Sequence, residues 1–259
     1  MSLDKIVESC QFLLNNYHDA QDSRLYLDSR LNEKSQEIFQ FGYFPNIQNI
    51  SILMDLVGEE ALYKEDLLYS WEIEDSLSHR RALLNYFENH PVVMPFKDPY
   101  GKIVGLVGRT LLSSDEMKQQ NIPKYKNSKE SKKFKKGNLL FGLYENKQTI
   151  LSTDSVYVVE GQFDVIKAWE IGFRNVVALG NNNMTSYQLS VISRYTNNIF
   201  LLLDNDEAGQ KGRKRIIKKY GHLANIRNFY IPEDYKDIDE YITKANIKQY
   251  DEMSFVVKD

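Results

Sequence analysis

The 259-residue chain contains a single cysteine, Cys10, and only four histidines. One cysteine cannot form an internal disulfide, and these few residues cannot build a cysteine-rich zinc site. No apolar run is long enough to cross a membrane, and the N-terminus lacks the pattern of a signal peptide. These absences exclude a disulfide-stapled secreted protein, a structural zinc ribbon and a membrane-spanning protein. They favour a reducing compartment, the cytoplasm, and an ordinary buried role for Cys10.

Two common nucleotide-binding signatures are also missing, the GxGxxG fingerprint and the GxxxxGK[ST] loop. The net charge is −3, which excludes a uniformly basic nucleic-acid coat but leaves room for local patches. Hydrophobic residues make up 42% of the chain, enough to form a packed core. The length allows one large domain or two modest ones.

The first 90 residues favour helices, because apolar residues recur at helical spacing in SLDKIVESCQFLLNNY. SRLYLDSRL and SQEIFQFGYF predict further helices. KEDLLYSWEI and residues 81–87 each fit either a helix or a short strand. PVVMPFKDPYGKIVGLVGRTLL then predicts two strands joined by a turn at 98–101.

A lysine-rich segment overlaps the second half of this pair of strands and continues beyond it. Residues 97–137 carry eleven Lys plus Arg against four Asp plus Glu, an excess of seven positive charges. One interpretation is a solvated loop, and the other is a surface that binds a polyanion. Tyr125 and Phe134 lie within the segment, and aromatic residues among lysines suit single-stranded nucleic acid, where bases stack.

From residue 155 onward, short apolar runs alternate with helical patterns. The runs are SVYVV, NVVAL, NIFLLL and IRNFYI, and a helical pattern follows each of them. The first helix is expected to stop at Gly172, and Thr185 is expected to cap the second. Because buried parallel strands read as continuous apolar runs, this part predicts a mostly parallel sheet with helices on both faces, an α/β fold.

Acidic residues follow three of the four predicted strands. They are Glu160 and Asp164, Asp204 and Asp206, and Asp237 and Asp239. In open α/β sheets the chemistry gathers at the carboxyl ends of the strands, so we expect these side chains at one edge. No His or Cys accompanies them, which disfavours zinc. Clustered carboxylates favour Mg²⁺ or Mn²⁺, which assist phosphoryl transfer.

These acids also allow other interpretations. Any one of them would also suit a helix cap, where Asp and Glu are common. DNDEAGQKGRKR resembles the start of an EF-hand loop, but Arg215 occupies the position of the bidentate Glu. The arrangement of the whole set therefore favours a metal site over unrelated caps.

Two motifs carry a family resemblance. EGQFD after one strand and DNDEAG after a later one resemble the Toprim domain shared by bacterial DnaG-type primases, topoisomerases and some nucleases. Four further segments are similar to the DnaG-type primase core: SRLYLDSRL with FQFGYFPN, VMPFKDPYGKIVGLVGRT, IPKYKNSKESKKFKKGNLLFGLYE and KDIDEYI. The resemblance covers about residues 12–245.

The resemblance implies an α/β fold in two parts. A mixed α+β subdomain at residues 1–150 would bind nucleic acid. A Toprim subdomain with a Rossmann-like, mostly parallel sheet would occupy residues 151–245 and hold the metal, followed by a C-terminal tail at 246–259.

The family's functional residues carry over onto matching positions of this sequence. The implied catalytic acids are Glu160, Asp164, Asp204 and Asp206. The implied metal ligands are Glu160, Asp204, Asp206, Asp237 and Asp239. The implied basic ridge, which would contact nucleotide phosphates and template, comprises Arg109, Lys124, Tyr125, Asn127 and Lys136.

The implied activity is synthesis of RNA primers from ribonucleoside triphosphates on single-stranded DNA, with Mg²⁺ or Mn²⁺. Glu160, or a water held by the metal, would accept the proton of the attacking 3′ hydroxyl. Two alternatives remain: a Toprim nuclease, because hydrolysis uses the same acids, and a non-catalytic single-strand-binding factor. A topoisomerase is disfavoured because the chain has no room for strand-passage domains.

The sequence departs from the family in four places. His90 lies where the family carries arginines, in YFENHPVVMPF, and Lys97 stands where an arginine is usual. The family's zinc module and helicase-binding domain do not occur in the sequence. We therefore expect a bare polymerase core of phage or mobile-element type, aided by a replicative helicase or a separate zinc-bearing protein.

Overall fold

The computed structural model describes residues 2–75 and 78–258. Its contacts divide the chain into two units, the first comprising Met1–Phe96 and Ile103–Phe134, the second Lys97–Lys102 and Lys135–Asp259. The boundary differs from the expected one near residue 150, which lies inside helix α7 (Leu143–Thr153) of the second unit. None of the described helices combines the length and apolarity needed to cross a bilayer.

The first unit is rich in helices, as predicted. They are α1 (Ser2–Asn16), η1 (His18–Ala20), α2 (Gln21–Arg30), α3 (Glu33–Ile38), α4 (Ile50–Val57), α5 (Glu59–Lys64) and α6 (Ser114–Gln120). The apolar stripe of α1 is buried at Ile6, Cys10 and Leu13. Burial raises the pKa of the Cys10 thiol, so this residue packs as a small apolar side chain.

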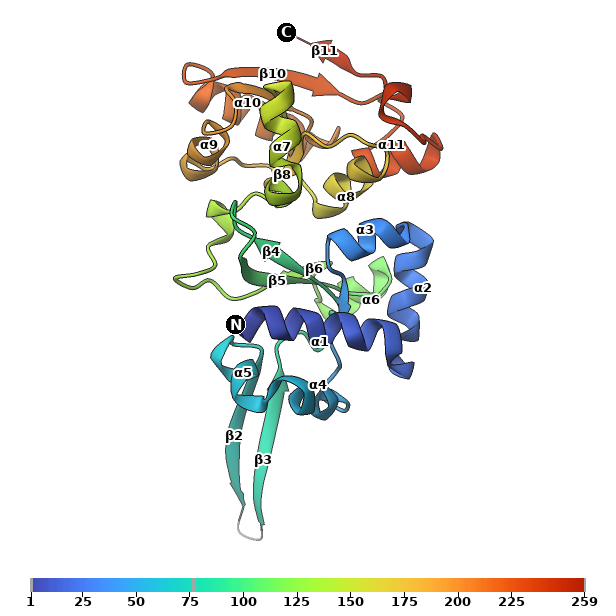
Figure 1. Ribbon diagram of the computed structural model, residues 1–259, viewed down its shortest axis with the longest axis vertical. Helices are drawn as coiled ribbons and strands as arrows, with labels where there is room; N and C mark the ends of the chain where they lie inside the picture. Colours follow the sequence, from blue (N-terminus) through green and yellow to red (C-terminus); the bar gives the residue numbers. More distant parts are fainter. Residues whose placement is uncertain (1, 76–77, 259) are drawn as a thin grey trace. The chain divides into compact units, whose positions relative to one another are not determined.

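The first unit also contains a four-stranded sheet in the order β1-β4-β5-β6 (Figure 1). Its strands are β1 (Gly42–Tyr43), β4 (Val92–Lys97), β5 (Ile103–Arg109) and β6 (Tyr125–Asn127). The predicted strands β4 and β5 are confirmed, and both are almost wholly buried. The segments that fitted either helix or strand form an antiparallel hairpin, β2 (Leu68–Asp75) and β3 (Ser78–Asn85).

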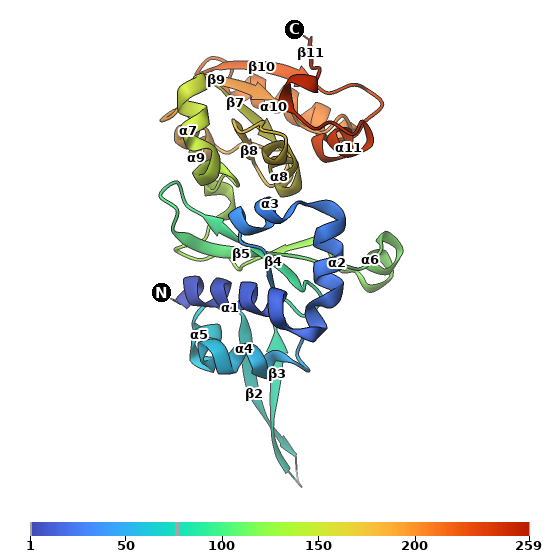
Figure 2. The same ribbon diagram turned by 45° about the vertical axis from the view of Figure 1, so that its right-hand side comes forward.

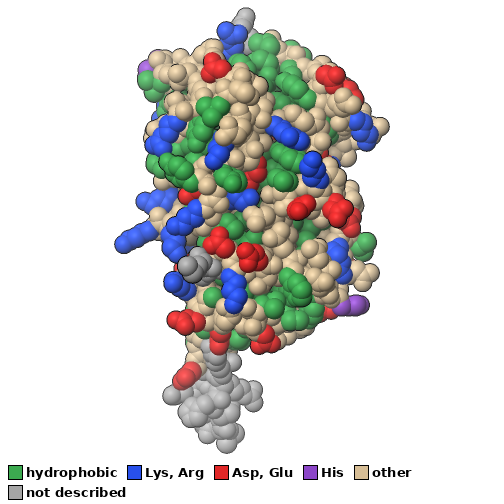
Figure 3. Space-filling view, viewed as in Figure 1, with side chains coloured by type: hydrophobic (Ala, Val, Ile, Leu, Met, Phe, Trp, Pro, Cys, Tyr) green, Lys and Arg blue, Asp and Glu red, His purple; other side chains and the backbone are tan. Residues whose placement is uncertain are grey.

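The lysine-rich segment includes two regular elements, and residues 128–135 after them form no helix or strand. It contains α6, whose Ser113 and Glu116 form a capping box, and β6, which pairs with β5. Lysine and arginine side chains gather on the side of the molecule where the chain after β6 runs (Figure 3).

The second unit is built on a five-stranded sheet in the order β11-β10-β9-β7-β8. Its strands are β7 (Val156–Val159), β8 (Val176–Ala178), β9 (Asn198–Leu201), β10 (Asn225–Tyr230) and β11 (Val256–Lys258). All pairs are parallel except β10 with β11. The predicted parallel sheet is confirmed, and the tail expected at 246–259 contributes the added antiparallel strand.

Helices cover both faces of this sheet. They are α7, η2 (Lys136–Asn138), α8 (Gln162–Glu170), α9 (Ser186–Ile192), α10 (Glu207–Tyr220), α11 (Ile238–Lys244) and η3 (Tyr250–Glu252). Figure 2 shows α7 and α9 on one side and α8 and α11 on the other. Thr185 caps α9 as predicted, accepting a hydrogen bond from the Gln188 backbone N–H at 3.0 Å.

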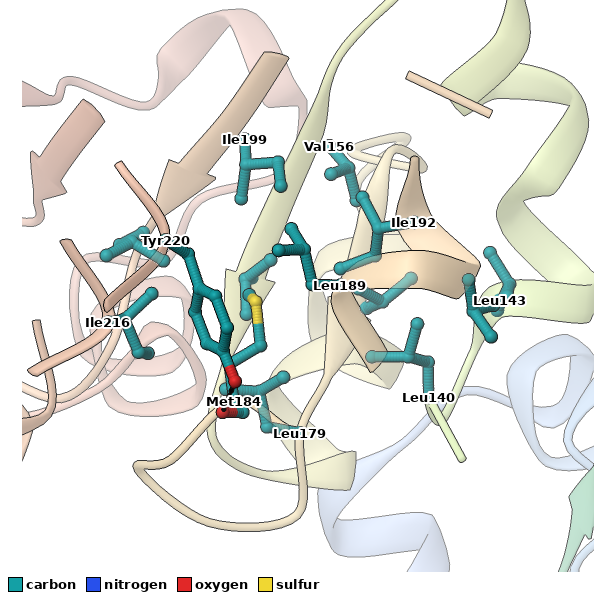
Figure 4. Close-up of a cluster of buried hydrophobic side chains, with 14 of the residues drawn as sticks. Leu140, Leu143, Val156, Leu179, Met184, Leu189, Ile192, Ile199, Ile216 and Tyr220 are labelled. Carbon is teal, nitrogen blue, oxygen red and sulfur yellow. Dashed lines mark hydrogen bonds between the residues drawn. The ribbon is translucent and has the colours of Figure 1, made fainter. Parts of the chain in front are cut away.

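The alternation of side chains along the strands sends two different sets to the two faces. Aliphatic residues such as Val158 and Leu201 pack with Leu189 of α9 and Tyr220 of α10 in a fully buried cluster (Figure 4). The opposite face is aromatic, with the ring of Tyr157 5.0 Å from that of Phe200. The sheet is therefore covered on both faces, and the loops at the ends of its strands are the places where functional side chains can be exposed.

Candidate active site

The central pair of the site comes from two neighbouring strands. Glu160 directly follows β7, and Asp204 follows β9, which pairs with β7 in parallel. Parallel neighbours end at the same edge of a sheet, and the Asp204 backbone N–H donates a hydrogen bond to Glu160 Oε1 at 3.3 Å. The sequence prediction that these acids converge is confirmed for this pair.

A glycine allows the close approach of α10 to this pair. A Cβ atom on Gly209 would lie 2.1 Å from the Asp204 carbonyl oxygen and 3.1 Å from Glu160 Oε1. In a helix interior, alanine is normally more stabilising than glycine by about 1 kcal/mol. Overpacking costs about 1–3 kcal/mol, so the clash outweighs that gain and only glycine fits here.

Asp164 lies in the first turn of α8 and is buried. Its carboxylate accepts hydrogen bonds from the backbone N–H groups of Gly161, at 3.0 Å, and Asp239, at 3.2 Å. Asp164 thus links the start of α8 to the start of α11, which brings the third acidic segment to the same edge.

Asp206 and Asp237 are helix N-caps. Asp206 Oδ1 accepts from the Gly209 backbone N–H at 2.9 Å, and Asp237 Oδ1 accepts from the Glu240 N–H at 2.8 Å. The capping role weighed from sequence is therefore real for both. It does not remove their charge from the cluster, because both carboxylates still repel the neighbouring acids.

This crowding of negative charge shifts the acid equilibria. Burial, with repulsion from Asp204, raises the pKa of Glu160 to about 7. Burial, with repulsion from Asp237 and Asp204, raises the pKa of Asp164 well above its ordinary range. Burial also raises the pKa of Asp204, although Lys236 opposes that shift. The edge carries more negative charge than its surroundings neutralise.

The donor chemistry fits a hard divalent cation. Among residues 2–75 and 78–258, no three His, Cys, Asp or Glu side chains converge tightly enough to hold a metal ion unaided. Mg²⁺ usually keeps several waters and binds through one or two carboxylates together with substrate phosphates. Glu160 and Asp204 match that mode. The Asp204 backbone N–H holds the Glu160 carboxylate beside Asp204, and burial and repulsion between the two acids raise the pKa of Glu160.

Two residues of the site were not identified from the sequence. Lys236 Nζ lies 3.3 Å from Asp204 Oδ2, and attraction to Asp204 raises the pKa of this lysine despite partial burial. The fully buried Arg213 of α10 donates to the carbonyl oxygens of Leu201, at 2.6 Å, and Leu203. Arg213 therefore fixes the backbone that leads to Asp204.

The residues of the predicted basic ridge in the first unit occupy different environments. Arg109 is buried, and its guanidinium lies 5.5 Å from the ring of Tyr26 and 5.3 Å from that of Tyr125. Arg109 also donates to the carbonyl oxygens of Thr110 and Lys124. Arg109 therefore positions the strand from within, with the half-buried ring of Tyr125 against its guanidinium, whereas Lys124 is exposed.

Asn127 and Lys136 complete the ridge predicted from sequence. The Asn127 Oδ1 is buried without a hydrogen-bond partner among the described residues. Lys136 belongs to the second unit, where its Cε would lie 2.9 Å from a Cβ on Gly180. The Gly180 backbone N–H donates to the Glu160 carbonyl at 2.9 Å, so Lys136 lies beside the acidic edge.

His90 and Lys97, which lie where the sequence resemblance leads us to expect arginines, are engaged inside the fold. His90 is buried, its Nε2 lies 2.8 Å from the Pro123 carbonyl, and burial lowers its pKa. Lys97 forms a shielded ion pair with Glu145 at 2.9 Å. Neither side chain is presented to solvent as a phosphate contact.

Replacing Glu160 by Gln removes a charge that burial and Asp204 both oppose. The folded-state pKa is raised to about 7 from an ordinary value of 4.5, so the wild type loses stability as pH rises through this interval. In EDTA we expect Glu160→Gln to unfold a few degrees above the wild type at about pH 8, and nearer to it at about pH 5.

Thermal unfolding at both pH values measures this difference. Glu8→Gln, an exposed carboxylate on α1, is the matched control and should shift neither midpoint. Millimolar Mg²⁺ at pH 8 should raise the wild-type midpoint more than that of Glu160→Gln. A metal-free Glu160→Gln protein that melts below the wild type at pH 8 would contradict the electrostatic account.

Comparison with known proteins gives two family matches. Residues 11–147 match the model for the DNA primase catalytic core, N-terminal domain, and residues 157–242 match the Toprim-like model. The first match alone covers more than half of the chain.

Individual relatives agree with these matches. The chain is 32% identical to the DNA primase of Aquifex aeolicus over 245 residues, covering 93% of this chain and 46% of the relative. It is also 32% identical to the DNA primase of Synechococcus elongatus, covering 86% of this chain and 32% of the relative. The chain thus spans half or less of the length of these curated relatives.

Solved structures resemble the whole chain. The Aquifex aeolicus primase structure, with zinc-binding and RNA polymerase domains, gives a TM-score of 0.74 at 29% identity, covering 98% of this chain and 60% of that one. The E. coli primase catalytic core gives a TM-score of 0.75 at 26% identity, covering 94% and 75%. A DnaG primase catalytic domain bound to single-stranded DNA gives 0.74 at 25% identity, covering 94% and 76%.

Proposed function

The chain belongs to the DnaG-type DNA primase catalytic-core family with a Toprim domain, and from this premise we propose that it synthesises RNA primers on single-stranded DNA. The observation that carries the proposal is the pairing of Glu160 with Asp204 at the edge of the parallel sheet. Burial and the charge of Asp204 destabilise the ionised form of Glu160, and the cation of a magnesium-bound triphosphate would stabilise it.

In the proposed reaction, the 3′ hydroxyl of one ribonucleotide attacks the α-phosphorus of the next. A phosphodiester bond forms, the bond to pyrophosphate breaks, and the hydroxyl proton leaves to Glu160 or to water. Mg²⁺ or Mn²⁺ held by Glu160, Asp204 and Asp206, with Asp237 and Asp239 nearby, would supply positive charge to the phosphate oxygens. Asp164, buried between α8 and α11, would fix the geometry of the edge.

The basic ridge would position the reactants. Lys124 and Lys136 carry the charge suited to phosphates, and Tyr125 presents a ring on which a base can stack. Asn127 follows Lys126 on β6, and its part in the ridge stays a prediction from the sequence. Arg109 supports this ridge from within by bracing Tyr125.

Two alternatives use the same residues. A Toprim nuclease would attack phosphorus with water, and a non-catalytic factor would bind the strand without chemistry. The match of residues 11–147 to the primase core favours polymerisation over both. A phage or mobile-element origin, a replicative helicase partner and a zinc-bearing partner stay predictions from the sequence.

A priming assay separates these functions. The protein is incubated with single-stranded DNA, labelled ribonucleotides and Mg²⁺ or Mn²⁺, beside Glu160→Gln and the exposed control Glu8→Gln. We expect oligoribonucleotides from the wild type and the control, and at least a hundredfold less from Glu160→Gln, about the loss of one electrostatic catalytic group. Nicked DNA without RNA product would favour the nuclease, and binding alone would favour the accessory factor.

Removing both ridge lysines, Lys124→Ala with Lys136→Ala, should weaken binding of single-stranded DNA or nucleotide. Each lost phosphate contact should lower the dependence of log affinity on log salt by about 0.7. Fluorescence anisotropy across a salt series measures this change. The Mg²⁺-dependent rise in unfolding temperature should persist, because neither lysine is a metal ligand. Unchanged affinity and salt slope would show that this part of the segment is only a solvated face.

A further inference from the structure

We propose that a second strand-binding surface lies on the β2–β3 hairpin and the chain after β6. This surface, the hairpin strip, consists of Tyr69, Trp71, Leu84, Tyr86, Lys126 and Lys129. We infer that it binds single-stranded nucleic acid by base stacking and phosphate contacts. It shares a ligand class with the proposed function but uses other residues, and it does not depend on the acids.

The hairpin register builds the aromatic half of the strip. Tyr69 pairs with Leu84 and Trp71 pairs with Ala82, so these four residues share one face of the hairpin. Trp71 is 49% exposed and Leu84 is 51% exposed. Glu72, one residue along, points to the opposite face by the same alternation. An apolar, partly aromatic surface is therefore open to solvent, free of this carboxylate.

Lysines interleave with these rings. Lys129 Nζ lies 4.2 Å from the ring centre of Tyr69 and 5.8 Å from that of Tyr86. Lys126 Nζ lies 4.1 Å from the ring centre of Tyr86. These cation–π contacts hold the two ammonium groups beside the rings. Phosphates could therefore reach the lysines while bases reach Trp71 and Tyr69.

The strip carries net positive charge. Partial burial and repulsion from Lys129 lower the pKa of Lys126. Asp66 is the carboxylate that acts on Lys129. Among the described residues at these rings, Lys126 and Lys129 against Asp66 leave one excess positive charge, which a phosphate backbone would neutralise.

A cavity of about 180 Å³ continues the strip on its lysine side. It is lined in part by Asp66, Lys129, Lys132 and Lys133, with the buried Phe134 at its wall. Lys132 and Lys133 on this rim extend the positive surface beyond the hairpin, and Lys133 is paired there with Glu65 at 3.4 Å. A strand that stacks on Trp71 and Tyr69 would thus meet further positive charge along its path.

The hairpin strip is distinct from the predicted basic ridge. Consecutive residues of a strand point to opposite faces, and on β6 Tyr125 faces Arg109 whereas Lys126 faces Tyr86. The same strand therefore separates two basic and aromatic surfaces. Single-stranded nucleic acid is favoured over an acidic protein because exposed rings gain from bases, which have stacking faces, and not from carboxylates.

Trp71 provides a direct test, because the second tryptophan, Trp169, is buried. In the Trp169→Phe background, titration with an oligo(dT) strand should quench the fluorescence of Trp71. Trp71→Ala with Lys129→Gln, in the otherwise native chain, should weaken oligo(dT) binding by at least about tenfold, from one lost stack and one lost phosphate contact. Phe12→Ala with Lys5→Gln, an exposed ring and lysine on α1, is the matched control and should leave affinity unchanged.

Three results would overturn the proposal. The first is that oligo(dT) leaves the fluorescence of Trp71 unquenched and the double variant binds it as tightly as the wild type. The second is that the protein binds blunt duplex as tightly as oligo(dT), without quenching. The third is that polyglutamate displaces the strand and that the double variant weakens this displacement. A protein that fails to prime yet shows quenching and tenfold loss would support the strip and refute the proposed function. A protein that primes but shows neither effect would do the reverse.

Discussion

Repulsion among carboxylates at the end of a parallel sheet is the constraint around which the second unit is organised. Glu160 and Asp204 arrive from neighbouring strands, and burial and mutual charge raise the pKa of both. The surroundings restrain these side chains more than they neutralise them. Arg213 fixes the backbone that leads to Asp204, and Gly209 leaves room for the helix beside it. Lys236 supplies one partly exposed cation.

This arrangement lowers the free energy of unfolding of the metal-free protein, and the same repulsion favours binding of a cation. A site that is already neutral would hold a divalent cation weakly, whereas uncompensated carboxylates favour it and its attached phosphates. Asp206 and Asp237 each have two roles, because both are also helix N-caps. Each one satisfies a helix N-terminus and still contributes to the negative field at the sheet edge.

The sequence predicted those features that depend on local pattern. Apolar runs ending in acids gave the parallel sheet and the convergence of Glu160 with Asp204. Features that depend on tertiary packing were not predictable. The buried role of Arg109 requires the ring of Tyr26, which is distant in sequence. Hairpin β2–β3 stayed open between helix and strand, although residues 69–74 alternate apolar and polar types, because pairing with β3 decides the outcome, and β11 likewise needs β10 as a partner.

The most direct test of the account is binding of Mn²⁺, followed by the loss of its free electron paramagnetic resonance signal. We expect saturable binding of Mn²⁺ to the wild type at neutral pH, and triphosphate should strengthen it. Asp204→Asn, which keeps the shape of the side chain but removes its charge, should weaken that binding at least about tenfold, the effect of about 1.4 kcal/mol. Equal Mn²⁺ binding by the wild type and Asp204→Asn would contradict the claim that this carboxylate pair exists to hold a divalent cation.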